Sequence, residues 1–215
     1  MQCPERYTRV AFFVSGLEYV RTTKRLVLAS RSPRRSALLA QIGLHVDVIP
    51  AEVEEDFDVN ASAAENAIRL AQKKGEHVAQ QIDNAIIIAA DTIVVIDGEM
   101  LAKPLDHADA VRMLIRLSDR THVVHTGIAL VDRPSNQQLS TVESTSVTFR
   151  HLPLDEIEEY VRGGSPMDKA GAYGIQDDYG AVFVKRIEGC YYNVMGFPLS
   201  RFHELLQQFQ AQLNI

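Results

Sequence analysis

Apolar positions along this chain follow two different periods, and each period predicts one kind of secondary structure. Runs rich in β-branched residues predict strands, whereas apolar residues spaced three or four apart predict helices. Because the pattern contains both hairpins and helical crossovers, it predicts an α/β or α+β architecture with a mixed sheet. The predicted strands cover residues 26–29, 45–49, 86–96, 99–103, 123–132, 141–149 and 181–187. The predicted helices cover residues 33–42, 62–81, 106–117, 154–161 and a C-terminal stripe of Phe202, Leu205, Leu206 and Phe209.

Capping residues mark where several of these helices begin. Ser32 precedes Pro33, which places a good N-cap residue before a proline in the first helical position. Ser62 and Glu65 have the spacing of a capping box. Asp106 occupies the N-cap position of the next helix. These signals set the helical register, and therefore decide which side chains each helix buries.

Composition and charge narrow the classes of protein that fit. The chain has 215 residues, enough for one large domain or for two lobes that share a core. Its formal charge of −6 argues against a nucleic-acid partner, because binding a phosphate backbone usually needs a basic surface. A local basic cluster can still bind a small anion. No stretch reaches the roughly 18 apolar residues of a membrane span, so no membrane partner is predicted.

The N-terminal region and the cysteines predict a cytoplasmic protein. Residues 10–20 are mildly apolar, but Glu18 interrupts them and no clean cleavage site follows, so no signal peptide is predicted. We predict that residues 1–24 form an extension and that residues 25–215 form the domain. Cys3 and Cys190 are too few for a disulfide framework and lack zinc-finger spacing, which predicts two free thiols.

Two arginines stand where a helix usually carries acidic residues. The first turn of a helix attracts negative charge, yet Arg34 and Arg35 follow Ser32 and Pro33 here. Free backbone N–H groups, the helix dipole and two guanidinium groups together favour an anion site, most naturally for phosphate. The alternative is a pair of solvated arginines that reach back to acidic partners such as those at positions 54 and 55.

Asp91 lies inside the most apolar predicted strand. A carboxylate there is costly unless it meets a metal, a cation or hydrogen-bond donors. If residues 97 and 98 form a two-residue hairpin loop, paired residue numbers sum to 195. Thr92 then lies opposite Lys103, and Asp91 lies opposite Pro104. The hairpin therefore predicts a lysine near the buried carboxylate, serving either catalysis or a structural salt bridge.

A segment rich in small residues, residues 168–176, ends in Gln176. Its glycines allow a backbone to approach a ligand closely. The Gln176 amide offers a donor and an acceptor, which match the N3–H and a carbonyl group of uracil or thymine. Taken alone, the segment is more typical of an ordinary glycine-containing loop than of a base-binding site.

Two other groups of polar residues are candidate metal ligands. His122 and His125 are three apart in a predicted strand, so they face opposite ways and are not expected to bind one ion. The acidic run at residues 52–58 has the character of a solvated loop. Beside an arginine–phosphate site, however, a hard cation such as Mg²⁺ needs carboxylates, and this run supplies them.

In their order along the chain, these motifs resemble the Maf family of nucleotide pyrophosphatases. The matching pieces are residues 28–35 (LASRSPRR), 90–92 (ADT), 103–104 (KP), 122–127 (HVVHTG), 168–176 (DKAGAYGIQ) and 193–198 (NVMGFP). They span roughly residues 25–210. The resemblance implies an elongated α/β mixed-sheet fold, shared with inosine triphosphate pyrophosphatases, with a central cleft between two lobes.

The resemblance also implies roles for individual residues. Arg34, Thr92 and Gln176 are the expected specificity residues, and Asp91 is the expected proton acceptor. Asp91 and Glu55 are expected to hold a divalent cation, Mg²⁺ or Mn²⁺. The residues expected to bind phosphate are Ser30, Ser32, Arg34, Arg35, Lys74 and Lys103.

The combination of motifs is similar to the branch of the family that hydrolyses dTTP and UTP to the monophosphate and pyrophosphate. The nucleoside triphosphate is thus the expected partner, and the family is expected to form homodimers. Two alternatives remain open: the same chemistry on 7-methyl-GTP or another purine nucleotide, and a nucleotide-binding regulator of cell division with little turnover. The intact Asp91, Glu55 and Lys103 favour an enzyme.

Two positions depart from the family pattern. Asp119 replaces a glycine often found before the histidine-containing strand, and Asp177 with Asp178 follows Gln176 where a glycine is usual. Neither change removes an expected catalytic group. The second adds negative charge beside the proposed base-reading residue.

Overall fold

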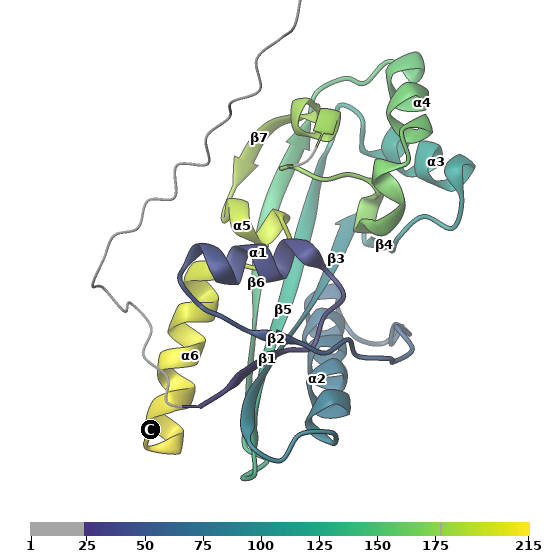
Figure 1. The fold of residues 1–215 in the computed structure, drawn as a ribbon. Coiled ribbons are helices and arrows are strands. Elements are labelled where there is room, and N and C mark those ends of the chain that lie inside the picture. Colours follow the sequence, from purple (N-terminus) through teal and green to yellow (C-terminus); the bar gives the residue numbers. More distant parts are fainter. Residues whose placement is uncertain (1–23, 177) are drawn as a thin grey trace, which may run out of the picture.

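A computed structural model describes residues 24–176 and 178–215. One mixed sheet runs through the molecule, with the strand order β2-β1-β3-β5-β6-β7 and with β4 paired to β3 (Figure 1). β1 is parallel to β2 and β3, and the other neighbours are antiparallel. The predicted α/β class with a mixed sheet is therefore confirmed. The strands are β1 (Leu26–Leu28), β2 (Asp47–Val48), β3 (Ala85–Ile96), β4 (Glu99–Leu101), β5 (Thr121–Arg133), β6 (Gln138–Phe149) and β7 (Val184–Glu188).

The predicted helices are all present, and their caps follow the sequence signals. Ser62 and Glu65 form the full capping box, and the Asp106 side chain accepts a hydrogen bond from the Asp109 backbone N–H. Ser32 occupies the N-cap position, although its side chain makes no capping hydrogen bond. The helices are α1 (Pro33–Gln41), α2 (Ala63–Ala79), α3 (His107–Leu117), α4 (Leu154–Arg162), α5 (Tyr191–Val194) and α6 (Leu199–Leu213).

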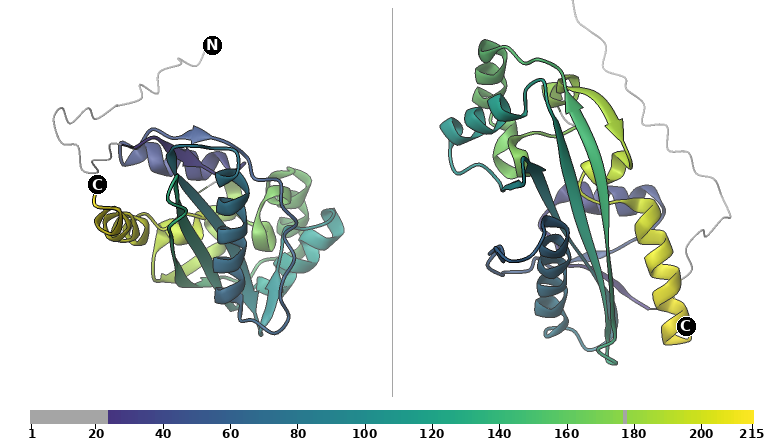
Figure 2. Two further views of the ribbon diagram at one scale, coloured as in Figure 1. Left: turned by 90° about the horizontal axis from the view of Figure 1, so that it is seen from below. Right: turned by 180° about the vertical axis from the view of Figure 1, so that it is seen from behind.

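Helices cover both faces of the sheet. In β3, Ile86 and Ile88 pack in a cluster with α1 and α6, whereas Ile87 and Ala89 pack in another cluster with residues of α2. Figure 2 shows α2 and α6 on opposite sides of the long strands. Because successive residues of a strand face opposite ways, burial on both faces explains why the first six residues of β3, Ala85 to Ala90, are all apolar.

The molecule is elongated, with a lobe at each end of the long strands β3, β5 and β6 (Figure 1). One lobe contains α1, α2, α6, β1 and β2. The other contains α3, α4, β4, β7 and three short 3₁₀ helices, η1 (Ser165–Asp168), η2 (Ala170–Ala172) and η3 (Asp178–Phe183). This second lobe has its own core, in which Phe149, Tyr160, Tyr173 and Phe183 are buried together. The predicted two-lobed arrangement is confirmed.

Several predicted boundaries were wrong. The hairpin register is correct at Ile96 and Glu99, but β4 ends at Leu101, so the pairs that would place Lys103 opposite Thr92 do not form. The backbone leaves the ladder there, and the Ala102 carbonyl accepts a hydrogen bond from the Gly171 N–H instead. Residues 181–183 belong to η3 rather than to a strand, β6 begins three residues before its predicted start, and α5 was not predicted.

The structure describes Asp119, one of the two departures from the family pattern, but not Asp177. Asp119 adopts φ +56°, in the left-handed region that glycine favours, so the position keeps the backbone of a glycine while carrying a side chain. Asp177 lies outside the described residues.

The N-terminal predictions are tested only in part. The predicted extension, apart from Lys24, and Cys3 lie outside the described residues. Lys24 itself contacts the domain, because its Nζ lies 2.5 Å from Asp132 Oδ1. Cys190 has a free thiol. Among the helices of residues 24–176 and 178–215, none is both long enough and apolar enough to cross a membrane.

A helix lies very close to the sheet at Gly127 of β5. Gly127 is paired with Asp91 across the β3–β5 ladder. A Cβ atom at Gly127 would overlap the backbone carbonyl of Ala67 in α2. Only a residue without a side chain lets α2 lie so near the sheet at the level of the buried carboxylate.

We expect Gly127→Ala to destabilise the protein by about 3 kcal/mol, because the new methyl group meets rigid backbone rather than a movable side chain. Gly75→Ala in α2 is a matched control at the same helix–sheet interface. Its Cβ would meet the Val131 side chain at 3.1 Å, which can shift, and alanine favours a helix by about 1 kcal/mol. Urea unfolding measures the free energy of unfolding of both variants. Equal losses would contradict the inference that α2 packs too closely on Gly127 to accept a side chain.

Candidate active site

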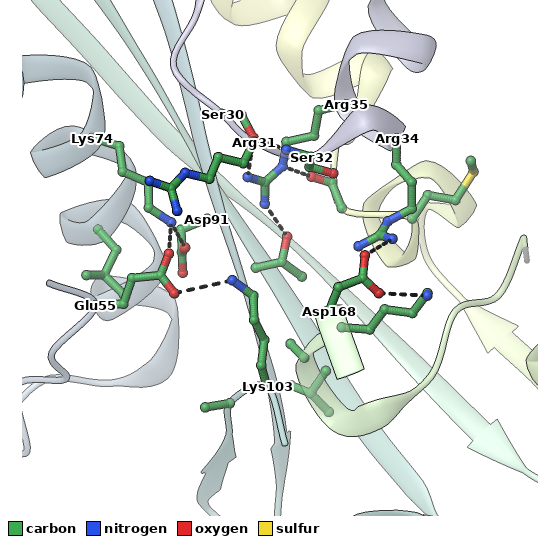
Figure 3. Close-up of a pocket in the computed structure, with 18 of the residues that line it drawn as sticks. Ser30, Arg31, Ser32, Arg34, Arg35, Glu55, Lys74, Asp91, Lys103 and Asp168 are labelled. Atoms are coloured by element: carbon green, nitrogen blue, oxygen red, sulfur yellow. Dashed lines mark hydrogen bonds and ion pairs between the residues drawn. The ribbon is translucent and has the colours of Figure 1, made fainter. Parts of the chain in front are cut away.

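A cleft of about 820 Å³ lies between the two lobes. All of the site residues predicted from the sequence line it: Ser30, Ser32, Arg34, Arg35, Glu55, Lys74, Asp91, Thr92, Lys103 and Gln176. They come from the β1–α1 loop, α1, α2, β3 and the loops that follow β2, β4 and η2 (Figure 3). The structure thus brings together residues that are separated by up to 146 positions in the sequence.

Arg35 lines the cleft from the start of α1. Its guanidinium group donates hydrogen bonds to the carbonyls of Gly196 (2.9 Å) and Ala90 (2.8 Å) and to the hydroxyls of Ser30 (3.2 Å) and Thr92 (3.1 Å). Burial lowers the pKa of Arg35, and the nearby Asp91 charge opposes that effect. Arg35 is therefore a fixed positive charge that connects α1, β3 and the loop after α5. Its side chain does not extend into solvent.

Asp91 and Glu55 share one lysine. The Nζ of Lys74 lies 2.5 Å from Asp91 Oδ1 and 2.6 Å from Glu55 Oε1. The helical register of α2 explains this placement, because Lys74 lies on the same buried face as Asn66 and Leu70. The predicted lysine near Asp91 therefore exists, but it comes from α2 and not from the hairpin.

The two carboxyl groups have opposite pKa shifts. Burial raises the pKa of Asp91, although the charges of Lys74 and Arg35 partly counteract it. Burial also raises the pKa of Glu55, but the hydrogen bond and charge of Lys74 and the charge of Lys103 outweigh it and lower the net value. Two carboxylates whose pKa values are pushed apart are typical of acid–base chemistry.

The acidic loop at residues 52–58 is clamped onto α2. The Asp56 carboxylate lies 2.8 Å from Lys73 Nζ and 3.5 Å from an Arg69 nitrogen, and Lys73 also donates to the Glu54 carbonyl. This clamp aims Glu55 into the cleft, where Lys103 Nζ lies 3.6 Å from its other oxygen. Only part of the acidic run therefore has the solvated character suggested by its composition.

The carboxylates at this end of the cleft suit a hard cation. Asp91 Oδ1 and Glu55 Oε1 converge on the same point, now taken by the Lys74 ammonium group. Carboxylate oxygens are the donors that Mg²⁺ and Mn²⁺ prefer. Among the described residues, no group of three or more histidine, cysteine, aspartate or glutamate side chains is arranged so that it could hold a metal ion. A cation here would therefore rely on two carboxylates together with water or substrate oxygens.

The other end of the cleft is formed by the glycine-containing segment. Gln176 lines the cleft, as do Tyr173 and Gly174. Arg34 reaches this end, where its Nη1 lies 2.8 Å from Asp168 Oδ2 (Figure 3). The arginines therefore do not pair with residues 54 and 55, as the alternative interpretation proposed. Sequence reasoning gave Asp168 no individual role, although the residue opens a motif that was recognised.

The two histidines of β5 have separate partners. His122 is buried beneath the cleft, and its Nε2 lies 2.8 Å from the hydroxyl of Tyr173. His125 Nδ1 lies 2.8 Å from the Ser144 hydroxyl. The prediction that they do not bind one ion is consistent with these contacts. His122 instead contacts the hydroxyl of Tyr173, a residue that lines the cleft.

The fold and the cleft agree with comparisons to known proteins. Residues 25–209 match the family model described as Maf-like protein. The chain is 47% identical to a dTTP/UTP pyrophosphatase of Dictyoglomus turgidum over 88% of this chain and 98% of that protein. It is 48% identical to a dTTP/UTP pyrophosphatase of Moorella thermoacetica over 86% of this chain and 95% of that protein. The chain belongs to the Maf-like protein family.

We expect His122 to make stability depend on pH. Burial lowers its pKa from 6.5 to about 4, so between these values the unfolded chain binds a proton that the folded chain does not. This contribution is fully present above about pH 6.5 and is lost as the pH falls toward 4. Between pH 7 and pH 5 it amounts to about 2 kcal/mol.

Urea unfolding at these two pH values tests the expectation. His122→Gln keeps a polar side chain beside Tyr173 but cannot titrate, so its free energy of unfolding should fall less than that of the wild type. His45→Gln, at an exposed position, controls for the loss of a histidine. An identical fall in the wild type and His122→Gln would contradict the burial argument.

Proposed function

We propose that this protein is a nucleoside triphosphate pyrophosphatase that hydrolyses dTTP and UTP to the monophosphate and pyrophosphate. The observation that carries the proposal is the buried Asp91 carboxylate, whose Oδ1 lies 2.5 Å from Lys74 Nζ. The cleft around it is also lined by Arg34, Arg35 and Lys103. A nucleotide-binding regulator would not need a carboxylate of raised pKa at that position. The names of the relatives supply the substrates, and the motifs of this chain match that branch.

The chemistry divides between a base and a set of cations. The Asp91 carboxylate accepts a proton from a water molecule, whose oxygen attacks the α-phosphorus. The bond from this phosphorus to the bridging oxygen breaks, and pyrophosphate leaves with that oxygen. The positive charges of Arg35, Lys74 and Lys103 stabilise the negative charge that grows on the leaving group.

Asp91 and Glu55 would hold a Mg²⁺ or Mn²⁺ ion in the complete enzyme. Such an ion neutralises phosphate charge and lowers the pKa of bound water. The Lys74 ammonium group lies between the two carboxylates, so it would compete with such an ion for their oxygen atoms.

Base selection is assigned to the opposite end of the cleft. One glutamine amide can pair with both the N3–H and a neighbouring carbonyl of uracil or thymine. Cytosine lacks this N3–H, and guanine is larger. Gln176 is half-buried in the cleft wall, where such pairing would be shielded from water.

The proposal also includes the assembly and the location of the protein. A homodimer follows from the family resemblance alone. A cytoplasmic location follows from the free Cys190 thiol and from the sequence pattern.

Pyrophosphate release across a panel of nucleotides tests the function. We expect dTTP and UTP to be hydrolysed roughly ten- to hundred-fold faster, as kcat/KM, than CTP, ATP, GTP and 7-methyl-GTP, because a lost buried polar contact has an effect of that size. EDTA should abolish turnover, and Mg²⁺ or Mn²⁺ should restore it. A purine preference would mean that the base is misassigned, and nucleotide binding without turnover would favour a regulator.

Asp91→Asn tests the proton acceptor. We expect kcat to fall by at least ~10²-fold, while the fold survives because Lys74 keeps its contact with Glu55. Asp132→Asn is a matched control, because Asp132 is also buried and also lies 2.5 Å from a lysine, but outside the cleft. The control should lose stability and keep turnover. Near-normal hydrolysis by folded Asp91→Asn protein would remove Asp91 from the mechanism.

A further inference from the structure

An ion pair crosses the cleft from one lobe to the other. Arg34 stands in the first turn of α1, and Asp168 ends η1 in the opposite lobe. Their side chains meet at 2.8 Å, and both line the cleft. The two residues are 134 positions apart in sequence, so only the approach of the lobes brings them together.

Asp168 also contacts a lysine of its own lobe. Its other oxygen lies 2.8 Å from Lys169 Nζ, and the Lys169 ammonium group donates to the Ser165 carbonyl at 2.5 Å. Burial raises the pKa of Asp168, but the hydrogen bonds from Lys169 and Arg34 outweigh it and lower the net value. The carboxylate is therefore ionised at neutral pH and has little freedom to turn, because a cation holds each of its oxygens.

The neighbouring arginines consequently serve different ends of the cleft. Arg35 is fixed against β3 beside Thr92, where its charge acts on Asp91. Arg34 points away from that end and toward η1, in the segment that continues to Gln176 (Figure 3). Arg34 and Lys169 both contact the Asp168 carboxylate, so this end of the cleft contains an anion as well as two cations.

We propose that Asp168 is a specificity-positioning residue, which holds the Arg34 guanidinium group at the end of the cleft that receives the pyrimidine base. The inference rests on the proposed function and assigns Asp168 a part in it. An arginine presents N–H donors in a rigid fork, so fixing one arm on a carboxylate orients the others. Asp168 thereby lets Arg34 donate to a base carbonyl in a single geometry and keeps the triphosphate at the opposite end of the cleft.

The experiment measures kcat and KM for dTTP, UTP, ATP and GTP in the wild type, Asp168→Asn, Asp168→Ala, Arg34→Ala and Arg34→Ala/Asp168→Ala. Both Asp168 variants should lower the ratio of kcat/KM for pyrimidine over purine substrates about ten-fold, mainly through a higher KM for dTTP and UTP. The double variant should lose no more selectivity than Arg34→Ala alone, because Asp168 acts through Arg34.

Glu188→Gln is the matched control. Glu188 pairs with Arg186 at 2.5 Å and is about as exposed as Asp168, but it does not line the cleft. The control should leave the selectivity ratio unchanged, and every variant should melt within about 4 °C of the wild type.

Three outcomes would overturn the assignment. A uniform loss for all substrates would make Asp168 a structural residue. A uniform gain would make it an electrostatic barrier to the triphosphate. If the double variant lost as much selectivity as the two single variants together, Asp168 would not act through Arg34. Failure of the proposed function is a different result, because it is seen in the wild type, as a purine preference or as absent turnover.

Discussion

The close packing of α2 against the sheet is the constraint on which the site depends. Gly127 has no side chain, so the Ala67 backbone can lie directly over β5 at the level of Asp91. Two turns further along α2, this packing delivers Lys74 to Asp91. A buried carboxylate in a central strand would be very costly without that cation. One glycine thus makes the Lys74–Asp91 contact possible.

The cleft holds its charges in pairs. Lys74 lies between Asp91 and Glu55, Arg34 meets Asp168, and Arg31 meets Glu52. Such pairing limits the repulsion among many like charges in one cavity. The pairs also mark two ends of the cleft, one with Asp91 and Glu55 and the other with Asp168.

Local rules were sufficient wherever short-range interactions decide the structure. The capping box at Ser62, the cap at Asp106 and the first pairs of the hairpin after β3 were predicted correctly. Local rules failed where a distant segment binds the same backbone groups. The hairpin ladder stops at Leu101 because the next residue bonds to Gly171 of another motif, and no local pattern contains that information.

The sequence by itself determined which residues are unusual: arginines at a helix start, an aspartate in an apolar strand and a glutamine after small residues. All of these line one cleft. Only the tertiary structure decided their pairing. It assigned Lys74 rather than Lys103 to Asp91, and Asp168 to Arg34. The physical reason is that an ion pair depends on distances of a few ångströms between segments far apart in sequence, which periodicity and spacing cannot specify.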